Sequence, residues 1–370
     1  MQSLVTPYKN RILIVDDVSE NLRILSEVLK DNYTIMFARN GKDAIRLANS
    51  DPAPDLILLD IIMPGMNGYE VCDIIRNKPD TKNIPIMFIS AQDNENDEAY
   101  GLSLGANDYI RKPFKASLIK NRVANQLEFK RYRDNLEDIV AERTKKLNLT
   151  QEVTIHAMAS LAEWRDPETG EHILRTQFYV RALATHLATK EKYKNIITPD
   201  FVNMIYLSAP LHDVGKIGIA DSILQNHKKL NEEDFNNMKQ HTIIGYEVLQ
   251  ESDKLLGGKS FLTMAGEIAY CHHERWDGKG YPRGIKGEEI PLAARIMSVA
   301  DVYDALRSIR VYKPSMDHEK SKNIIIEGKG TQFDPDIVDA FLELEDTFKQ
   351  ISEEQKDKIH HEEKITKTAH

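Results

Sequence analysis

The chain has little cysteine and no long apolar run. Only two cysteines, Cys72 and Cys271, occur among its 370 residues, which excludes the disulfide framework of small secreted proteins. The longest apolar runs, such as LILLDIIM, are interrupted by Asp60 and fall well short of the roughly 20 residues that span a bilayer. The N-terminal segment MQSLVTPYKNR lacks the apolar stretch of a signal peptide. We therefore expect a cytoplasmic protein with no membrane contact.

The chain also has fewer basic than acidic residues, with 49 Lys and Arg against 58 Asp and Glu, which gives a formal net charge of -9. Non-specific binding to DNA or to anionic membranes needs a basic surface, and the sequence shows no basic recognition helix. A transcription factor is therefore the least favoured function, and an anionic substrate would have to meet local cations or metal ions. With 41% hydrophobic and 29% charged residues the chain has the composition of a globular protein. Its length suggests two domains.

The first domain, expected over residues 1–125, alternates short apolar runs with amphipathic stretches. The apolar runs are RILIV, YTIMFA, DLILL, IPIMFIS and DYI. They are continuous rather than alternating, which is typical of parallel strands buried on both faces. Helical patterns lie between them, as in ENLRILSEVLK and GYEVCDIIRN. This order predicts a doubly wound α/β domain with a five-stranded parallel sheet, whose function lies at the carboxyl ends of the strands.

The remainder of the chain is expected to be helical. Residues 118–153 contain no Gly or Pro, and Phe129, Tyr132, Leu136 and Ile139 follow the 3-4-3 spacing of a short coiled-coil seam. This pattern favours a long helical connector that makes the chain a homodimer, and the alternative is an amphipathic helix lying on its own domain. Residues 154–349 predict an all-α domain. Residues 350–370 predict a charged tail of frayed helix or disorder.

Acidic residues stand at the ends of predicted strands in the first domain. Asp16 and Asp17 follow RILIV, and Asp60 follows DLILL. In a doubly wound sheet these ends are neighbours, and three crowded carboxylates favour a Mg²⁺ ion that keeps open positions for phosphate. Ser90 and Lys112 follow two further strands, where a hydroxyl and an ammonium group can contact a phosphoryl oxygen. Taken singly, each acid could equally be a solvated loop residue.

Residues 11–125 resemble the receiver domain of two-component response regulators. The resemblance implies that Asp60 is the phospho-acceptor, that Asp16 and Asp17 bind Mg²⁺ with it, and that Ser90 and Lys112 contact the phosphoryl group. It further implies a sensor histidine kinase as phosphodonor and identifies Tyr109 as the aromatic residue that reorients on activation. The peptide bond before Pro113 is a candidate cis bond.

The second domain carries side chains that bind metals. The segments RDPETGEHILR, APLHDVGK, MKQHTIIGYE, CHHERWDGKGYP and SVADVYDAL contribute Glu168, His172, His212, Asp213, His241, His272, His273 and Asp301. A lone histidine is usually a core or surface residue, but five of them with two or three carboxylates indicate one multinuclear centre. Imidazole with carboxylate suits Fe, Mn or Zn better than Ca or Mg.

The HDVGK stretch predicts how the catalytic residues are arranged. On a helix, His212 and Asp213 project about 100° apart, so that both can reach one ion. Asp213 is the expected bridge between ions, because its carboxylate has two oxygens. Lys216 projects to the side of His212, where its ammonium group can contact a phosphate oxygen or assist the leaving group.

Residues 165–313 resemble the HD-GYP subgroup of the HD phosphohydrolase superfamily. The superfamily pattern falls on His172, His212–Asp213 and Asp301, and the subgroup adds His241, His272–His273 and Gly280-Tyr281-Pro282. The resemblance implies hydrolysis of cyclic di-GMP to linear pGpG, and in some members on to GMP. It implies two or three transition-metal ions, iron first among them, with Glu168 supporting a third.

The resemblance also names substrate contacts and leaves alternatives open. Arg310 and Lys313 match a phosphate-contacting pair, and Tyr281 lies in a loop that lets a guanine approach closely. Arg307, Ile309 and Val311 depart from the usual pattern before and between these cations. The alternatives are therefore a binding adaptor of weak activity that signals through protein contacts, and a hydrolase of another cyclic dinucleotide.

Overall fold

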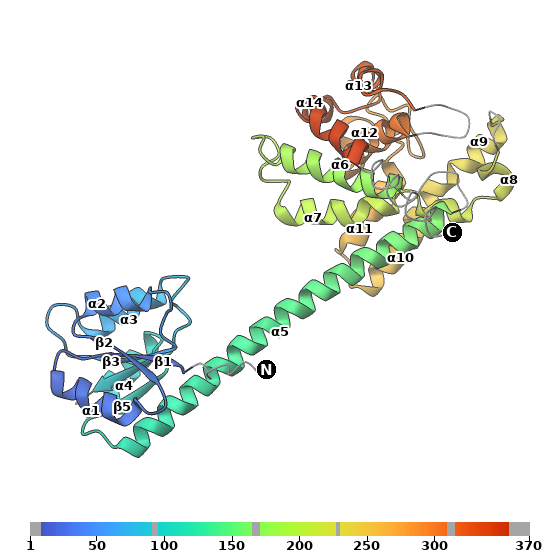
Figure 1. The fold of residues 1–370 in the computed structure, drawn as a ribbon. Helices are drawn as coiled ribbons and strands as arrows, with labels where there is room; N and C mark the ends of the chain where they lie inside the picture. The colour runs from blue at the N-terminus through green and yellow to red at the C-terminus, as the bar shows by residue number, and fades with distance from the viewer. Residues whose placement is uncertain (1–8, 91–94, 165–170, 227–229, 309–314, 355–370) are drawn as a thin grey trace, which may run out of the picture. The chain divides into compact units, whose positions relative to one another are not determined.

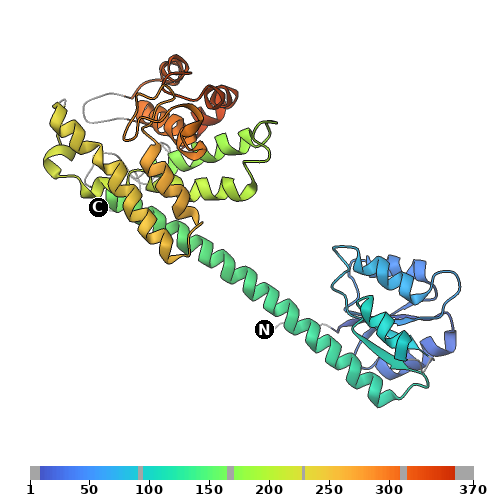
Figure 2. The ribbon, with the colours of Figure 1, turned by 180° about the vertical axis from the view of Figure 1, so that it is seen from behind.

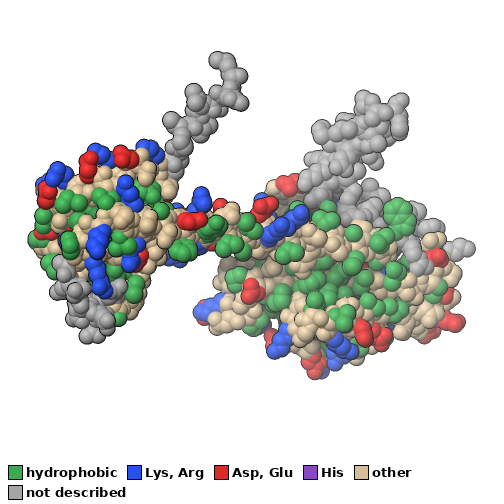
Figure 3. Space-filling view, turned by 90° about the horizontal axis from the view of Figure 1, so that it is seen from below, with side chains coloured by type: hydrophobic (Ala, Val, Ile, Leu, Met, Phe, Trp, Pro, Cys, Tyr) green, Lys and Arg blue, Asp and Glu red, His purple; other side chains and the backbone are tan. Residues whose placement is uncertain are grey.

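The protein divides into two compact units in the computed structural model, residues 1–145 and 146–370 (Figure 1). The structure describes residues 9–90, 95–164, 171–226, 230–308 and 315–354. On the face drawn in Figure 3, charges of both signs are scattered over the first unit, whereas apolar side chains gather over the second. None of the helices in the described ranges is both long and apolar enough to cross a membrane.

The first unit contains the predicted parallel sheet. Its strands are β1 (Arg11–Val15), β2 (Thr34–Ala38), β3 (Leu56–Asp60), β4 (Ile86–Ser90) and β5 (Asp108–Arg111), in the order β2-β1-β3-β4-β5. Every residue of β3 and β4 is buried, which explains why these strands are continuously apolar. The doubly wound α/β prediction is confirmed.

Helices cover both faces of this sheet. They are α1 (Ser19–Leu29), α2 (Gly41–Ala48), α3 (Gly68–Arg76), α4 (Glu95–Ser103) and the start of α5 (Ala116–Glu163). One core cluster joins the sheet to α2 and α3 through Ala44 and Val71, and another joins it to α1 and α5 through Leu25 and Ile119. Asn67 caps α3 reciprocally with Glu70, so this helix begins at a fixed residue after β3.

Helix α5 is one continuous element of 48 residues that links the two units. It covers the whole predicted connector, 118–153, and continues to Glu163. In the first unit, Ile119, Val123 and Leu127 are buried. Near its other end, Ile155, Ala159 and Ala162 are buried within the second unit. The seam residues Phe129, Tyr132, Leu136 and Ile139 are all exposed.

The second unit is helical, as predicted. Its α-helices are α6 (Glu171–Leu187), α7 (Pro199–Ser208), α8 (Asp221–Leu224), α9 (Glu232–Met238), α10 (Gln240–Leu255), α11 (Phe261–Cys271), α12 (Leu292–Arg307), α13 (His318–Glu327) and α14 (Pro335–Glu343). The helices α10 and α11 pack side by side in both views (Figures 1 and 2). Stacked and edge-on rings of Tyr179, Tyr303, Phe341 and Phe348 fill the main core.

The HDVGK stretch corrects one prediction. His212 and Asp213 do not lie on an α-helix but between two 3-10 turns, η1 (Ala209–Leu211) and η2 (Val214–Gly218). Helix α7 ends at Ser208, and Pro210, which has no N–H to donate, lies in the first turn. The directions of the His212 and Asp213 side chains are therefore set by the two 3-10 turns and not by the 100° spacing of an α-helix.

Candidate metal centres

Seven of the predicted ligand residues converge in the second unit. Asp213, His241, His272 and His273 form one group, and His172, His212 and Asp301 form another, with the ligand atoms of each group within 4.8 Å of one another. They come from elements far apart in the sequence: α6, the η1–η2 turn, the start of α10, the end of α11 and α12. Glu168 lies outside the described residues.

Asp213 lies between the two groups. Its Oδ1 is 3.2 Å from His241 Nε2 and 3.5 Å from His272 Nε2. Its Oδ2 is 3.5 Å from Nε2 of His212, which belongs to the other group. His172 Nε2 completes that second group, at 3.4 Å from His212 Nε2 and 3.6 Å from Asp301 Oδ1. One carboxylate thus presents an oxygen to each group, as a bridging ligand does.

The hydrogen bonds of the imidazoles fit metal binding. The Nδ1 atoms of His212, His241 and His272 lie 2.9, 2.7 and 3.0 Å from the backbone oxygens of Ala209, Met238 and Ile268, which fixes the rings and turns Nε2 toward the centre. Apart from their mutual contacts at 3.2 and 3.5 Å, which lack hydrogen-bond geometry, the buried Asp213 Oδ1, His241 Nε2 and His272 Nε2 have no hydrogen-bond partner among the described residues. Buried polar atoms rarely stay unsatisfied, so a cation among them accounts for all three.

Burial and charge set the protonation of this centre. Burial lowers the pKa of His212 to about 4, and burial with the neighbouring His272 holds the pKa of His273 well below its usual value. Both rings are therefore neutral at pH 7, the state that binds metal. Burial alone would raise the pKa of Asp213, but Lys216 and His212 outweigh it and hold that pKa well below the usual range.

Lys216 is tied to the same carboxylate. Its Nζ lies 2.8 Å from Asp213 Oδ2, and the lysine is buried. The sequence predicted that this ammonium group reaches the site. The structure places it against Asp213. The positive charge that was expected to contact phosphate therefore also offsets the negative charge of this candidate ligand.

Tyr281 stands beside the centre on the predicted GYP loop. Its ring centroid is 4.8 Å from that of His273. A Cβ on Gly280 would lie 2.4 Å from the backbone N of Arg275, so only glycine lets the loop approach this closely. Glu274 accepts hydrogen bonds from the backbone N–H groups of Arg283 and Gly284, which fastens the loop. Arg310 and Lys313 lie outside the described residues.

The first unit gathers the other predicted site. Carboxylate oxygens of Asp16, Asp17 and Asp60 lie within 4.8 Å of one another, and Lys112 Nζ is 3.2 Å from Asp16 and 3.1 Å from Asp60. Burial and the charge of Asp16 raise the pKa of Asp60 to about 6, against the influence of Lys112.

Three further residues frame this acidic site. Ser90 ends the neighbouring strand β4, and Tyr109 is buried on β5 with its ring tilted against Phe88. The Lys112–Pro113 bond is cis, as predicted. The acidic triad, the hydroxyl-bearing strand end and the lysine thus occupy one end of the sheet.

Comparison with known proteins identifies both units. A family model described as "HD domain" matches residues 135–337, and one described as "Response regulator receiver domain" matches residues 12–124. The chain belongs to the HD domain family. Its N-terminal part is a receiver domain, so the protein is a receiver–HD fusion. Both family resemblances read from the sequence are confirmed, and the HD family is metal-dependent.

Several relatives are enzymes of cyclic dinucleotides. The chain is 46% identical over 350 residues to the "Probable cyclic di-GMP phosphodiesterase" of Vibrio cholerae serotype O1, which covers 92% of this chain and 79% of that protein. It is 34% identical to the "Cyclic di-GMP phosphodiesterase response regulator RpfG" of Xanthomonas campestris pv. campestris, over 90% and 86% of the two chains. It is 37% identical to "3'3'-cGAMP-specific phosphodiesterase 2" of Vibrio cholerae, over 55% and 36%.

The HD domain contains a buried ion pair that the sequence analysis missed. Asp304 Oδ2 lies 2.8 Å from His172 Nδ1, and Arg175 donates to Asp304 at 2.6 and 2.9 Å. Burial opposes its charge, but the bonds from His172 and Arg175 lower the pKa of Asp304 to about 2. The available signal was spacing, since Asp304 lies three residues beyond Asp301 and Arg175 three beyond His172, on the same helix faces.

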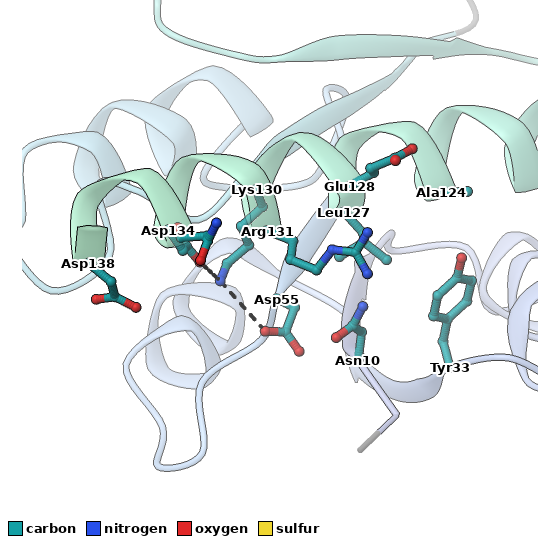
Figure 4. A pocket seen from close by; sticks show the side chains of 11 residues that line it. Asn10, Tyr33, Asp55, Ala124, Leu127, Glu128, Lys130, Arg131, Asp134 and Asp138 are labelled. Atoms are coloured by element: carbon teal, nitrogen blue, oxygen red, sulfur yellow. Dashed lines mark hydrogen bonds and ion pairs between the residues drawn. The ribbon is translucent and has the colours of Figure 1, made fainter. Parts of the chain in front are cut away.

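A cavity of about 680 Å³ in the receiver unit has no comparable chemistry. It lies along α5 and is lined by Asn10, Tyr33, Asp55, Lys130, Arg131 and Asp134, among others (Figure 4). Lys130 is 2.6 Å from Asp134 and 3.8 Å from Asp55, which itself accepts from the Arg11 backbone N–H. These charges are paired with one another. The ion pair between Lys130 and Asp55 therefore holds α5 against the residue that precedes β3.

Proposed function

We propose that this receiver–HD fusion is a metal-dependent phosphodiesterase that hydrolyses cyclic di-GMP to pGpG. The observation that carries the proposal is Asp213, which presents one oxygen to each of two groups of buried, oriented imidazoles. The names of relatives that align over most of both chains support the same substrate. Whether the product is cleaved further to GMP is decided by product chromatography.

The seven residues of the two groups would hold two ions, with iron first and manganese or zinc as alternatives, and Glu168 is the candidate for a third. Such ions supply Lewis acidity toward a phosphodiester and toward water. The chain's own residues orient the reaction. Asp213 fixes the spacing of the two groups, while Lys216 offers an ammonium group next to this carboxylate for the phosphate or the departing 3′ oxygen. Tyr281, Arg310 and Lys313 are proposed to bind the substrate.

The receiver domain is proposed to regulate this activity. Asp60 accepts a phosphoryl group from a sensor histidine kinase, with Mg²⁺ held by Asp16, Asp17 and Asp60. Ser90 and Lys112 are proposed to contact the phosphoryl oxygens. The support is the acidic triad with Lys112 Nζ 3.1 Å from Asp60. Signals would pass through α5, which is continuous from one unit to the other.

A homodimer through α5 and a cytoplasmic location complete the proposal. Phe129, Tyr132, Leu136 and Ile139 are between 42% and 67% exposed in the single chain. A repeated apolar seam left open on a helix favours a second helix as its partner. A cytoplasmic location follows from the intracellular nature of the proposed messenger and kinase.

Replacing Asp213 tests the proposed activity. We expect Asp213→Ala, purified without oxygen, to lose hydrolysis of cyclic di-GMP and to contain fewer ions per chain, because both groups lose their shared oxygens. Metal analysis and product chromatography measure the two effects. The exposed Asp200 on α7 provides a control as Asp200→Asn, which should behave as the wild type. A metal-free Asp213→Ala that still hydrolyses the substrate would refute the mechanism.

A second candidate is hydrolysis of another cyclic dinucleotide. It is favoured by the similarity to a protein named for 3'3'-cGAMP. Side-by-side rates with cyclic di-GMP and 3'3'-cGAMP separate the two. Tight binding of cyclic di-GMP by iron-loaded protein without any product would instead favour the adaptor function.

A further inference from the structure

A cluster of aromatic rings borders the metal centre on the side of α9. The Tyr281 ring lies against His273, with centroids 4.8 Å apart and planes at 32°. Phe235 on α9 meets Tyr281 edge-on at 6.2 Å. Phe235 is 45% exposed, although large aromatic rings are usually covered. A flat apolar group could therefore stack here without displacing any part of the core.

A lysine belongs to the same cluster. Lys239 Nζ lies 4.7 Å from the centroid of Phe235 and 5.6 Å from that of Tyr281. It donates to Asn236 Oδ1 at 3.0 Å, and it forms no ion pair with a carboxylate among the described residues. Lys239 precedes the ligand His241 by two residues, so its backbone position is fixed relative to the centre.

The order of these groups indicates what they meet. The His273 ring is next to the His241 ring, Tyr281 is next to His273, and Phe235 and Lys239 lie beyond Tyr281. If the scissile phosphodiester occupies the ligand groups, the part of the substrate that reaches Phe235 and Lys239 is a base. Stacking on aromatic side chains accepts any base, whereas the lysine discriminates between bases.

We propose that Phe235 and Lys239 form the guanine-binding wall of the site and make it selective for guanine over adenine. The ammonium group has three donors and no acceptor. Guanine presents two acceptors on its outer edge, O6 and N7, where adenine presents one acceptor and the N6 amino donor. Adenine would place its N6 amino group, a donor, against the ammonium group of Lys239, which can only donate. This inference rests on the proposed function, and it adds two residues and a selectivity to it.

The test uses the full-length, metal-loaded chain with three variants: Lys239→Met, Phe235→Leu and the control Lys254→Met. Lys254 lies on α10, the helix whose N-cap is Lys239, and its side chain is 74% exposed. Losing a charged hydrogen bond corresponds to roughly 10-fold or more. We therefore expect Lys239→Met to lower kcat/KM for cyclic di-GMP about 10-fold, mainly through KM, and to change the value for cyclic di-AMP much less.

Two binding measurements complete the test. We expect Lys239→Met to weaken competitive inhibition by GMP but not by AMP, and Phe235→Leu to weaken both, because stacking serves either base. Lys254→Met should match the wild type, and metal content should be equal in all four proteins. Equal losses with GMP and AMP for Lys239→Met would show a phosphate contact and overturn the guanine assignment, as would no loss at all.

Equilibrium binding of cyclic di-GMP separates this inference from the proposed function. Wild-type protein that binds cyclic di-GMP without cleaving it would overturn the proposed function alone. Equal dissociation constants for the wild type and Lys239→Met would overturn the guanine wall alone. Wild-type protein that neither binds nor cleaves cyclic di-GMP would overturn both.

Discussion

Asp304 shows how a single residue outside the candidate ligand groups can orient a side chain within them. It is fully buried, accepts two hydrogen bonds from Arg175 and lies 2.8 Å from His172 Nδ1. A carboxylate behind a ligand imidazole fixes the tautomer and the direction of its other nitrogen. The positive charge of Arg175 offsets the free-energy cost of burying this carboxylate. The orientation of His172 therefore depends on a pair that lies outside both candidate ligand groups.

We expect Asp304→Asn to weaken both the fold and the centre. The amide removes the negative charge of Asp304 from beside the buried guanidinium of Arg175, and breaking a buried ion pair in this way typically costs about 3–5 kcal/mol. Loss of such support for a ligand usually lowers metal affinity about 10–100-fold. Both tryptophans, Trp164 and Trp276, belong to the second unit, so urea unfolding followed by their fluorescence reports on this unit. Unchanged stability and unchanged competition with a chelator would contradict the role.

Asp60 gives a prediction with a defined pH dependence. Its pKa is raised from 3.8 to about 6, so the folded receiver disfavours the ionised carboxylate. The folded state then holds more protons than the unfolded state between these pH values, and stability falls as pH rises through that window. Above pH 6 the ionised Asp60 lowers the free energy of unfolding by its full amount, which is at most about 3 kcal/mol.

Asp60→Asn removes this penalty. We expect it to stabilise the receiver by about 1–2 kcal/mol at pH 8 without divalent ions, with no gain below about pH 4. Added Mg²⁺ should abolish the difference, because the ion stabilises the wild-type carboxylates. Hydrogen exchange of peptides from β3, corrected for intrinsic rates, measures the change. The exposed Asp80 serves as control in Asp80→Asn, and a gain equal to that control would show that Asp60 is not strained by its neighbours.

At the scale of elements, the sequence predicted the strands well and the turn that carries His212 and Asp213 badly. The runs ending at Asp60 and Ser90 are continuous because both faces are buried, so their ends, and with them the acidic site, could be located. Periodicity could not reveal that APLHDVGK forms 3-10 turns, because turns of three and five residues are too short to show a period. Pro210 was the available signal.

Relations between elements were the hardest to predict. Asp304 went unnoticed because its partner Arg175 is 129 residues away, and Phe235 because its contact depends on how α9 meets the GYP loop. The candidate ligand histidines were first grouped by their occurrence with carboxylates in five segments, and the motif resemblance then supplied the long-range pairing that spacing alone cannot.

Gly215 lies in η2 and lets this turn, which follows Asp213, pack closely against α10. A Cβ at this position would lie 1.9 Å from the backbone oxygen of His241 and 2.5 Å from the Gly245 N. We expect Gly215→Ala to separate η2 from α10, cost about 1–3 kcal/mol and lower metal content, because Asp213 and His241 move apart. Gly266→Ala is the matched control. Its Cβ would lie 3.2 Å from the flexible Gln250 side chain and at an ordinary contact distance of 3.5 Å from the Tyr246 ring, so tryptophan fluorescence should show little change. Equal behaviour of the two variants would disprove the close packing.

For the whole molecule, the question is whether phosphorylation at Asp60 changes turnover at the HD domain. The only covalent route within the chain is α5, which is buried against the sheet at Ile119 and within the HD unit at Ile155. A helix held at both ends can transmit a rearrangement of the receiver, and couplings of this kind typically amount to about 1–3 kcal/mol. That range corresponds to about 5-fold or more in a binding equilibrium.

We therefore expect a small-molecule phosphodonor with Mg²⁺ to change the rate of cyclic di-GMP hydrolysis by the full-length wild type about 5-fold or more. Asp60→Asn should not respond, since it has no acceptor oxygen, and its rate should equal that of the unphosphorylated wild type. Phosphate-affinity electrophoresis establishes the extent of phosphorylation. A wild type that is fully phosphorylated yet turns over at its original rate would show that the receiver does not act on the HD domain through α5.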